Sequence, residues 1–172
     1  YSSSNNTITG NTCNNNGNSG ICLFTSSNNT ITGNTCNNNN SDGILLYSSS
    51  NNNTVTGNTC NNNNNNGIYL YSSSNNTITG NTCNNNSIGI YLRESNYNTI
   101  IGNTCYNNNK GICLSSSNKN IVTGNTCIRG TGTPEDYSTN QYTIQIESIG
   151  GDYNLISSNN CMGKAVSIGG GM

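Results

Sequence analysis

A motif of eight residues, Asn-Thr-Ile-Thr-Gly-Asn-Thr-Cys at positions 6–13, recurs along almost the whole chain. Its glycine returns at positions 10, 33, 57, 80, 102 and 124, so the period is 22 to 24 residues, and a degenerate seventh copy ends at Cys161. A unit this short cannot bury a core of its own, so successive units must stack against one another. The period therefore predicts a solenoid.

Each repeat also contains a second apolar element, Gly-Ile-x-Leu, which first occurs at positions 20–23. Alternation places Ile8, Cys13, Ile21 and Leu23 on one side of the chain and the motif's threonines on the other, which is typical of β-strands. No stretch has a helical period. We expect an all-β parallel solenoid with three short strands per turn and about seven turns of 22–24 residues. It forms a single domain over residues 1–172, and because the chain begins in mid-repeat we expect a piece of a longer repeat protein.

Asparagine fills 43 of the 172 positions, and the motif fixes one of them directly after its glycine. Asparagine tolerates the left-handed backbone conformation of tight bends, and its amide can bond to an asparagine one layer away. These positions therefore predict a structural ladder, formed by Asn11, Asn34, Asn58, Asn81, Asn103 and Asn125.

The chain has nine cysteines, and seven of them occupy the last position of the motif. A cysteine fixed by the repeat is expected to be a small core side chain. Free thiols in a dry core, disulfides between adjacent layers and a metal site all remain open. We expect no metal and no cofactor, and assign a structural role to Cys13, Cys36, Cys60, Cys83, Cys105 and Cys127.

Composition argues against two kinds of partner. Charged residues make up 6% of the chain and the net charge is -1, so no basic patch is available to neutralise nucleic-acid phosphates. No apolar run approaches the roughly 18–20 residues that cross a bilayer, so we expect no membrane span.

Aromatic residues gather on the outward side of the Ile-x-Leu strands. Such a surface row suggests contact with a sugar or with another protein, although stacking that only stiffens the sheet is an alternative. We take the following as candidate binding residues, with Tyr1 and Leu45 as further members of the row: Phe24, Tyr47, Tyr69, Tyr71 and Tyr91.

Threonines on the outward side of the first strand form a second candidate surface. The two columns should lie about 6.6 Å apart, with layers about 4.8 Å apart, which resembles the Thr-x-Thr arrays of β-solenoid antifreeze proteins. Threonine is also a common exposed strand residue. The array comprises Thr7, Thr9, Thr30, Thr32, Thr54, Thr56, Thr77 and Thr79.

Regularity fails after Cys127, where about ten residues are inserted at positions 128–140. This loop holds the only proline, and loops on rigid scaffolds often carry function, although a tolerated insertion is the simpler alternative. Arg93, Glu94 and Glu147 could approach one another, with Glu135 and Asp136 joining them. Because no acid recurs at one repeat position, we assign no catalytic residue.

Six asparagines lie in Asn-x-Ser/Thr sequons, which would accept glycans in a secreted chain, although an asparagine-rich repeat also generates such sequons by chance. They are Asn5, Asn28, Asn39, Asn52, Asn75 and Asn85.

The repeated Asn-Thr-Ile-x-Gly-Asn followed by Gly-Ile-x-Leu resembles the right-handed parallel β-helix repeats of the NosD-like family, within the pectate-lyase-like superfamily. The chain also resembles long surface proteins of methanogenic archaea, through the repeated sequence Ser-Ser-Ser-Asn-Asn-Thr-Ile-Thr-Gly-Asn-Thr. The resemblance implies a β-helix that serves as a carbohydrate-binding or sugar-cleaving module, a surface scaffold or a copper-delivery protein. Copper binding does not carry over, because the chain has no histidine and no methionine-rich motif.

We therefore expect a non-enzymatic extracellular or cell-surface module with a structural or adhesive role. Its partners would be other copies of the protein, including end-to-end filaments or homo-oligomers, or cell-surface glycans. An ice-binding solenoid and a carbohydrate-binding or polysaccharide-cleaving β-helix are the alternatives.

Overall fold

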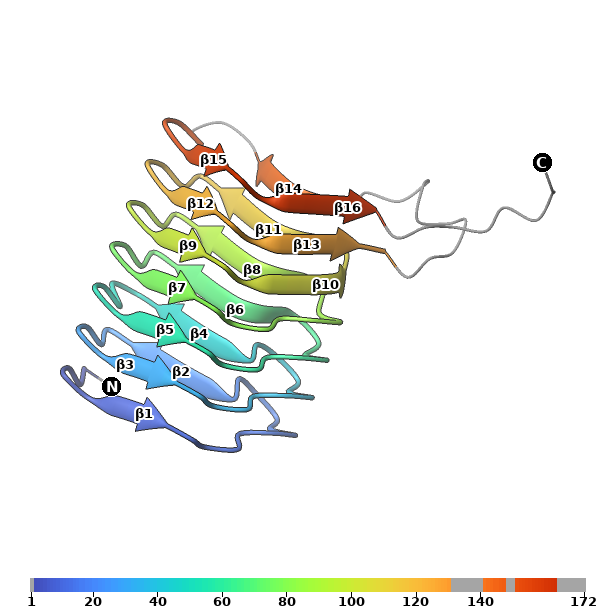
Figure 1. Cartoon of the computed structure of the whole chain (residues 1–172). Coiled ribbons are helices and arrows are strands. Elements are labelled where there is room, and N and C mark those ends of the chain that lie inside the picture. Colours follow the sequence, from blue (N-terminus) through green and yellow to red (C-terminus); the bar gives the residue numbers. More distant parts are fainter. Residues whose placement is uncertain (1, 131–140, 148–150, 164–172) are drawn as a thin grey trace, which may run out of the picture.

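The computed structural model describes residues 2–130, 141–147 and 151–163. The chain is a parallel β-helix in which each repeat forms one layer and the layers stack along one axis (Figure 1). The expected fold class is therefore confirmed. Equivalent ladder asparagines lie 23, 24, 23, 22 and 22 residues apart, and the next interval is 34. There are thus five regular turns followed by a turn lengthened by the insertion, rather than seven equal turns.

Three parallel sheets run along the stack. Sheet 1 has the order β1-β3-β5-β7-β9-β12-β15, sheet 2 the order β10-β13-β16, and sheet 3 the order β14-β11-β8-β6-β4-β2. Sheet 1 comprises Thr7–Thr9, Thr30–Thr32, Thr54–Thr56, Thr77–Thr79, Thr99–Ile101, Ile121–Thr123 and Leu155–Ser157. Sheet 2 comprises Thr104–Asn108, Thr126–Arg129 and Asn160–Gly163. In chain order, sheet 3 comprises β2 Ile21–Phe24, β4 Ile44–Tyr47, β6 Asn66–Tyr71, β8 Ile88–Arg93, β11 Lys110–Ser115 and β14 Tyr142–Glu147.

The second of the three expected strands is regular only in the last three layers. In the earlier layers this side of the solenoid is held by isolated parallel bridges from Thr12 through Thr35, Thr59 and Thr82 to Thr104. Only the short Thr-Cys pair is extended there, because an asparagine-rich bend follows immediately.

The core is a set of stacked columns that run parallel to the axis. Ile31 pairs with Val55 and Val55 with Ile78 in sheet 1, while Ile44 pairs with Ile68 in sheet 3, and all of these side chains are fully buried. The inward cysteines belong to the same core, on the side of sheet 2. The alternation read from the sequence is thus confirmed.

The predicted asparagine ladder is present. The backbone N–H and the Nδ2 of Asn34 both donate to Oδ1 of Asn58, at 2.9 and 3.0 Å, and the same pair of bonds is repeated at each junction from Asn11 to Asn159. Because the amides of the inner layers are almost fully buried, these bonds satisfy backbone groups that would otherwise lack partners.

Several further ladders occur that we did not predict, including the three that follow. One contains Asn6, Asn29, Asn53, Asn76, Asn98, Asn120 and Asn154. A second contains Asn16, Asn39, Asn63, Asn86 and Asn108. The third is formed by hydroxyls of Ser26, Ser50, Ser73, Ser95 and Ser117.

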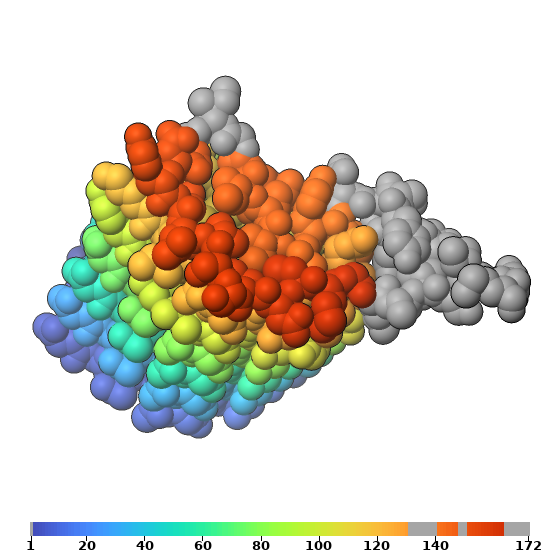
Figure 2. All heavy atoms as spheres, turned by 45° about the horizontal axis from the view of Figure 1, so that its top comes forward, coloured from blue at the N-terminus to red at the C-terminus, as the bar shows by residue number. Residues whose placement is uncertain are grey.

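The described ends of the stack expose core residues. Figure 2 shows the last layers, with β14, β15 and β16, and a hollow of about 590 Å³ there is lined by Ile144, Ile146, Ile156 and Cys161 among others. A hollow of about 340 Å³ at the opposite end is lined in part by Ile8 and Leu23. The expected end-to-end assembly stays a prediction.

Candidate functional site

Five aromatic side chains form a connected row on the outward face of sheet 3. We call this row the aromatic strip, and it contains Phe24, Tyr47, Tyr69, Tyr71 and Tyr91. Strand register places Phe24, Tyr47 and Tyr71 in one column, and Leu45, Tyr69 and Tyr91 in the adjacent column. The sequence prediction that these rings share one face is therefore confirmed. Tyr1, its suggested first member, lies outside the described residues.

The rings of the strip contact one another from layer to layer, with Phe24–Tyr47 and Tyr47–Tyr71 tilted by 43° and 30°. Centroids lie 5.4 Å apart for Phe24 and Tyr47, 5.3 Å for Tyr47 and Tyr71, and 5.0 Å for Tyr69 and Tyr91, and the last two rings are within 7° of parallel. Such ring contacts, both tilted and stacked, stabilise the sheet, and they also cover part of each ring face. The strip therefore presents ring edges and phenolic hydroxyls to a ligand more than open faces. Phe24 and Tyr47 are still 40% and 37% exposed.

Arg93 follows Tyr71 at the end of the column formed by Phe24, Tyr47 and Tyr71. Its guanidinium lies over the Tyr71 ring at 5.1 Å from the centroid, and it forms an exposed ion pair with Glu94 at 3.5 Å. A cation over an aromatic face is attracted by the ring's electron density. Burial raises the pKa of Tyr69 to about 12, so its hydroxyl remains protonated and able to donate a hydrogen bond at neutral pH.

A polar cluster lies directly beyond the strip on the same face. Lys110 donates a hydrogen bond to Glu147, and Cys113, the register partner of Tyr91, is fully buried although it is on the outward side of β11. Burial and the nearby Glu147 carboxylate raise the pKa of Cys113 to about 12, so this thiol is protonated and is a poor nucleophile. Burial lowers the pKa of Lys110, but the hydrogen bond to Glu147 outweighs it and the pKa is raised on balance.

Of the three residues that we expected to approach one another, Arg93 and Glu94 form an ion pair, but Arg93 and Glu147 do not pair. Ser115 separates the two in the register of sheet 3, and Glu147 instead pairs with Lys110 from the adjacent strand. No sequence signal indicates this pair, because the insertion lies between the two residues. Glu135 and Asp136 lie outside the described residues, as does most of the inserted loop.

The threonine array has the expected register. Thr7, Thr30, Thr54 and Thr77 pair in one column, and Thr9, Thr32, Thr56 and Thr79 pair in the other. The regular surface ends where Ile101 and Ile121 replace threonines, and these side chains are 38% and 39% exposed.

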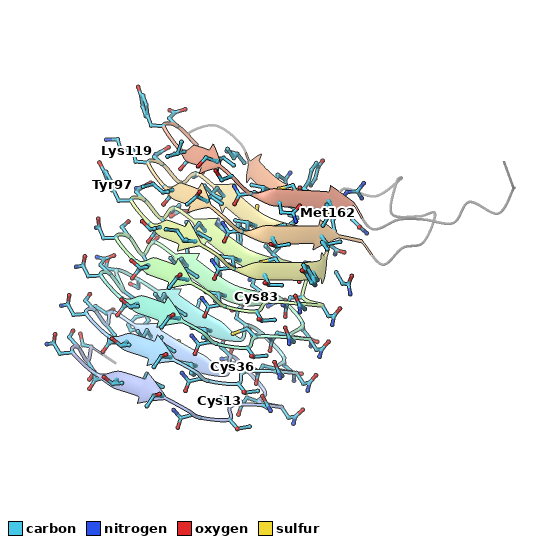
Figure 3. All side chains as sticks on the ribbon, viewed as in Figure 1. Cys13, Cys36, Cys83, Tyr97, Lys119 and Met162 are labelled. Atoms are coloured by element: carbon cyan, nitrogen blue, oxygen red, sulfur yellow. The ribbon has the colours of Figure 1, made fainter. Side chains whose placement is uncertain are left out.

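The motif cysteines form one inward file, of which Figure 3 labels Cys13, Cys36 and Cys83. All nine cysteines are free, and the five from Cys36 to Cys127 in this file are fully buried. Contact with neighbouring thiols and burial raise the pKa of Cys36, Cys83 and Cys127. The structure therefore has free thiols in the core and no disulfides between adjacent layers.

The described residues do not fit a copper site. Copper(I) prefers thiolate and thioether ligands, but the thiols of the inner layers are stacked singly and sealed from solvent. The chain has only two methionines and no histidine. Across residues 2–130, 141–147 and 151–163, no group of three histidine, cysteine or acidic side chains is arranged to hold a metal.

The part of the chain that the structure describes contains no helix long and apolar enough to cross a membrane.

Several solved structures share this fold. The periplasmic alginate epimerase AlgG is similar with a TM-score of 0.73 and 23% identity, over 89% of this chain and 39% of that one. The A-module of the Azotobacter vinelandii mannuronan C-5 epimerase AlgE6 gives 0.70 and 16%, over 95% of this chain and 55% of that one, and the AlgE4 A-module gives 0.67 and 15%, over 94% and 54%. The chain thus spans about two fifths to just over half of these structures.

No curated protein matches the chain significantly. The family model described as "Periplasmic copper-binding protein (NosD)" matches residues 1–163, which is nearly the whole chain. The resemblance read from the repeats is therefore confirmed, and the chain belongs to the NosD family.

Proposed function

We propose that the chain is a non-enzymatic, extracytoplasmic adhesion module that binds glycan chains along the aromatic strip. The observation that carries this proposal is the unbroken contact of five rings across four layers of one sheet face. Layers repeat about every 4.8 Å, which is close to the length of one sugar unit in an extended polysaccharide. A glycan lying along the axis would therefore meet an equivalent contact at each unit.

Tyrosine suits this role because its ring offers apolar area and its hydroxyl a hydrogen bond, at a small cost in side-chain entropy. Ring edges would contact sugar C–H groups, and phenolic hydroxyls would bond to sugar hydroxyls. Arg93 would add a charged hydrogen-bond donor at the end of the column that contains Tyr71. The family's periplasmic description supports an extracytoplasmic location.

The state of three of the four acidic residues that the structure describes supports a binding role without catalysis. Asp42 is buried and accepts bonds from Asn66, Glu94 pairs with Arg93, and Glu147 pairs with Lys110. Sugar-cleaving β-helices need carboxylates or bases that are free to reach the glycosidic linkage. Acids already engaged in these pairs are poorly placed for such work.

A glycan array tests the proposal. We expect the wild-type protein to bind a subset of extended glycans, and Tyr71→Ala to bind them at least about tenfold more weakly because it removes the ring that joins both columns. Thr56→Ala, on the outward face of sheet 1, is the matched control and should bind normally. Absence of binding to every glycan, or equal binding by Tyr71→Ala, would contradict the proposal. Turnover of a bound polysaccharide would contradict its non-enzymatic part.

The threonine array supports a second candidate, ice binding, because eight threonines stand in two columns in strict register. Only four of the described layers carry the complete pair of columns, so the flat surface is small. An ice-recrystallisation assay tests this function, with Thr56→Tyr expected to abolish any activity and Tyr71→Ala expected to preserve it. No inhibition by the wild-type protein at micromolar concentration would exclude it.

A further inference from the structure

One bend of the solenoid carries four sequon asparagines stacked in consecutive layers. The backbone N–H of Asn5 donates to the carbonyl that precedes Asn28, and the same bond links Asn28 to the layer of Asn52 and Asn52 to the layer of Asn75. The four residues therefore form one column along the axis, which we call the sequon ridge. Its position is taken over in later layers by Tyr97 and Lys119, which Figure 3 shows along one edge of the stack.

The ridge residues have an unusual conformation and free side chains. Each has a positive φ, from 56° for Asn28 and Asn52 to 61° for Asn5, so the bend turns sharply at that point. Each is exposed, and within the described part of the chain none of their side-chain amides makes a hydrogen bond. The next asparagine in each sequence behaves differently, since Asn29 and Asn53 use their amides in a buried ladder.

The two other sequons have contrasting environments. Asn39 is 1% exposed and its Nδ2 donates to Asn63 at 2.9 Å, so its amide nitrogen is inaccessible in the folded chain. Asn85 lies at a different bend, with φ of 55°, and is exposed. Its neighbours in the adjacent layers, Asn62 and Asn107, are not followed by serine or threonine at the second position.

We propose that the sequon ridge and Asn85 are acceptors for N-linked glycans, and that adjacent layers of the ridge exclude one another. The donor would be a lipid-linked oligosaccharide diphosphate presented by a transferase. Nδ2 of the asparagine attacks the anomeric carbon, a C–N bond forms, the C–O bond to the diphosphate breaks, and the amide proton passes to a base of the transferase. The hydroxyl required at the second following position is supplied by Thr7, Thr30, Thr54 and Thr77 on the ridge.

Exclusion follows from the spacing of the layers. Acceptors in adjacent layers are about 4.8 Å apart. The first sugar is attached directly to the amide, so it cannot diverge far from its neighbour, and a substituted pyranose ring is wider than one layer. Each molecule should therefore carry at most two glycans on the ridge, in non-adjacent layers: at Asn5 and Asn52, at Asn28 and Asn75, or at Asn5 and Asn75. Asn85 has no competing acceptor and should be modified independently.

Intact-protein and glycopeptide mass spectrometry on the chain secreted from a host with an oligosaccharide transferase tests this proposal. We expect at most three glycans per folded molecule, two on the ridge and one at Asn85, with Asn39 unmodified. Asn28→Gly, which keeps the positive φ without strain, should raise joint occupancy of Asn5 and Asn52 by about 1.5-fold, because the exclusion divides wild-type molecules among three arrangements and the variant retains two of them.

Asn85→Gly is the matched control, because it removes an acceptor from the other bend and should leave ridge occupancy unchanged. Molecules with glycans on all four ridge positions would overturn the exclusion. Modified Asn39 in folded protein, or no glycan on either bend, would overturn the assignment of acceptors. Loss of glycan binding by Tyr71→Ala concerns the separate proposal about the aromatic strip, and it leaves this one unaffected.

Discussion

Replacing Asn58 with alanine removes one amide from the middle of the predicted ladder. Oδ1 of Asn58 accepts hydrogen bonds from the backbone N–H and Nδ2 of Asn34, at 2.9 and 3.0 Å, and Nδ2 of Asn58 donates to the carbonyl of Ile31 at 2.9 Å. Asn34 and Asn58 are each 1% exposed. The N–H of Asn34 would therefore remain buried with its acceptor removed. Its own Nδ2 would keep its bonds to Ile8 and Thr32.

The expected cost is roughly 2–4 kcal/mol of unfolding free energy, of which about 1–3 comes from the unpaired N–H and about 1 from the other lost bonds. Asn11→Ala is the matched control, because Asn11 is in the first layer, is exposed, and donates to Asn34 without receiving a ladder bond in the described chain. We expect this control to lose less than about 1 kcal/mol.

Urea unfolding followed by far-ultraviolet circular dichroism measures both variants. The slope with denaturant should be compared as well as the midpoint, because stacked repeats can lose two-state behaviour. Equal destabilisation by Asn58→Ala and Asn11→Ala would refute the argument that the ladder stabilises the fold by satisfying buried backbone groups.

Three further predictions concern single sites in the stack. Burial raises the pKa of Asp42, so the contribution of this carboxyl to stability is present below the ordinary aspartate pKa and is lost as pH rises through the raised value. Asp42→Asn should therefore unfold at a higher urea concentration than the wild type at pH 7. A stability advantage of this variant that persists undiminished in acid would contradict the prediction. Gly67→Ala should lower the thermal unfolding midpoint more than Gly57→Ala. A Cβ at position 67 would lie 2.6 Å from a backbone oxygen, whereas position 57 has open space and only the strain of φ +61°. Equal midpoints for the two variants would contradict this prediction. Ellman's reagent should react rapidly with Cys22 and Cys161 in the folded protein, and with all nine thiols only after unfolding.

The repeat predicted the fold because one inference, that each layer must bury its apolar side against the next, determines strand order and register together. It predicted the ladder through Asn58 for the same reason. The ladder through Asn53 also occupies a fixed motif position, so the repeat contained that signal. The ladder through Asn63 was hidden, because it lies within runs of asparagine where no neighbour identifies the inward residue.

The aromatic strip could be predicted as a face but not as a stack. Alternation places Tyr69 and Tyr91 on the outward side, but ring orientation depends on side-chain packing that period alone does not define. The pairing of Lys110 with Glu147 was beyond prediction, because the residues are 37 positions apart across the insertion. Regular spacing is informative only while the period holds.

Tyrosine fluorescence gives the most direct test of glycan binding by the strip. The chain has ten tyrosines and no tryptophan, so its emission reports on tyrosine environments, and four of the ten belong to the strip. Titration with a glycan selected from the array should give a saturable change in emission for the wild-type protein and for Thr56→Ala. The account predicts that Tyr71→Ala loses this saturable change. A wild-type titration that does not saturate, or an unchanged titration of Tyr71→Ala, would contradict it.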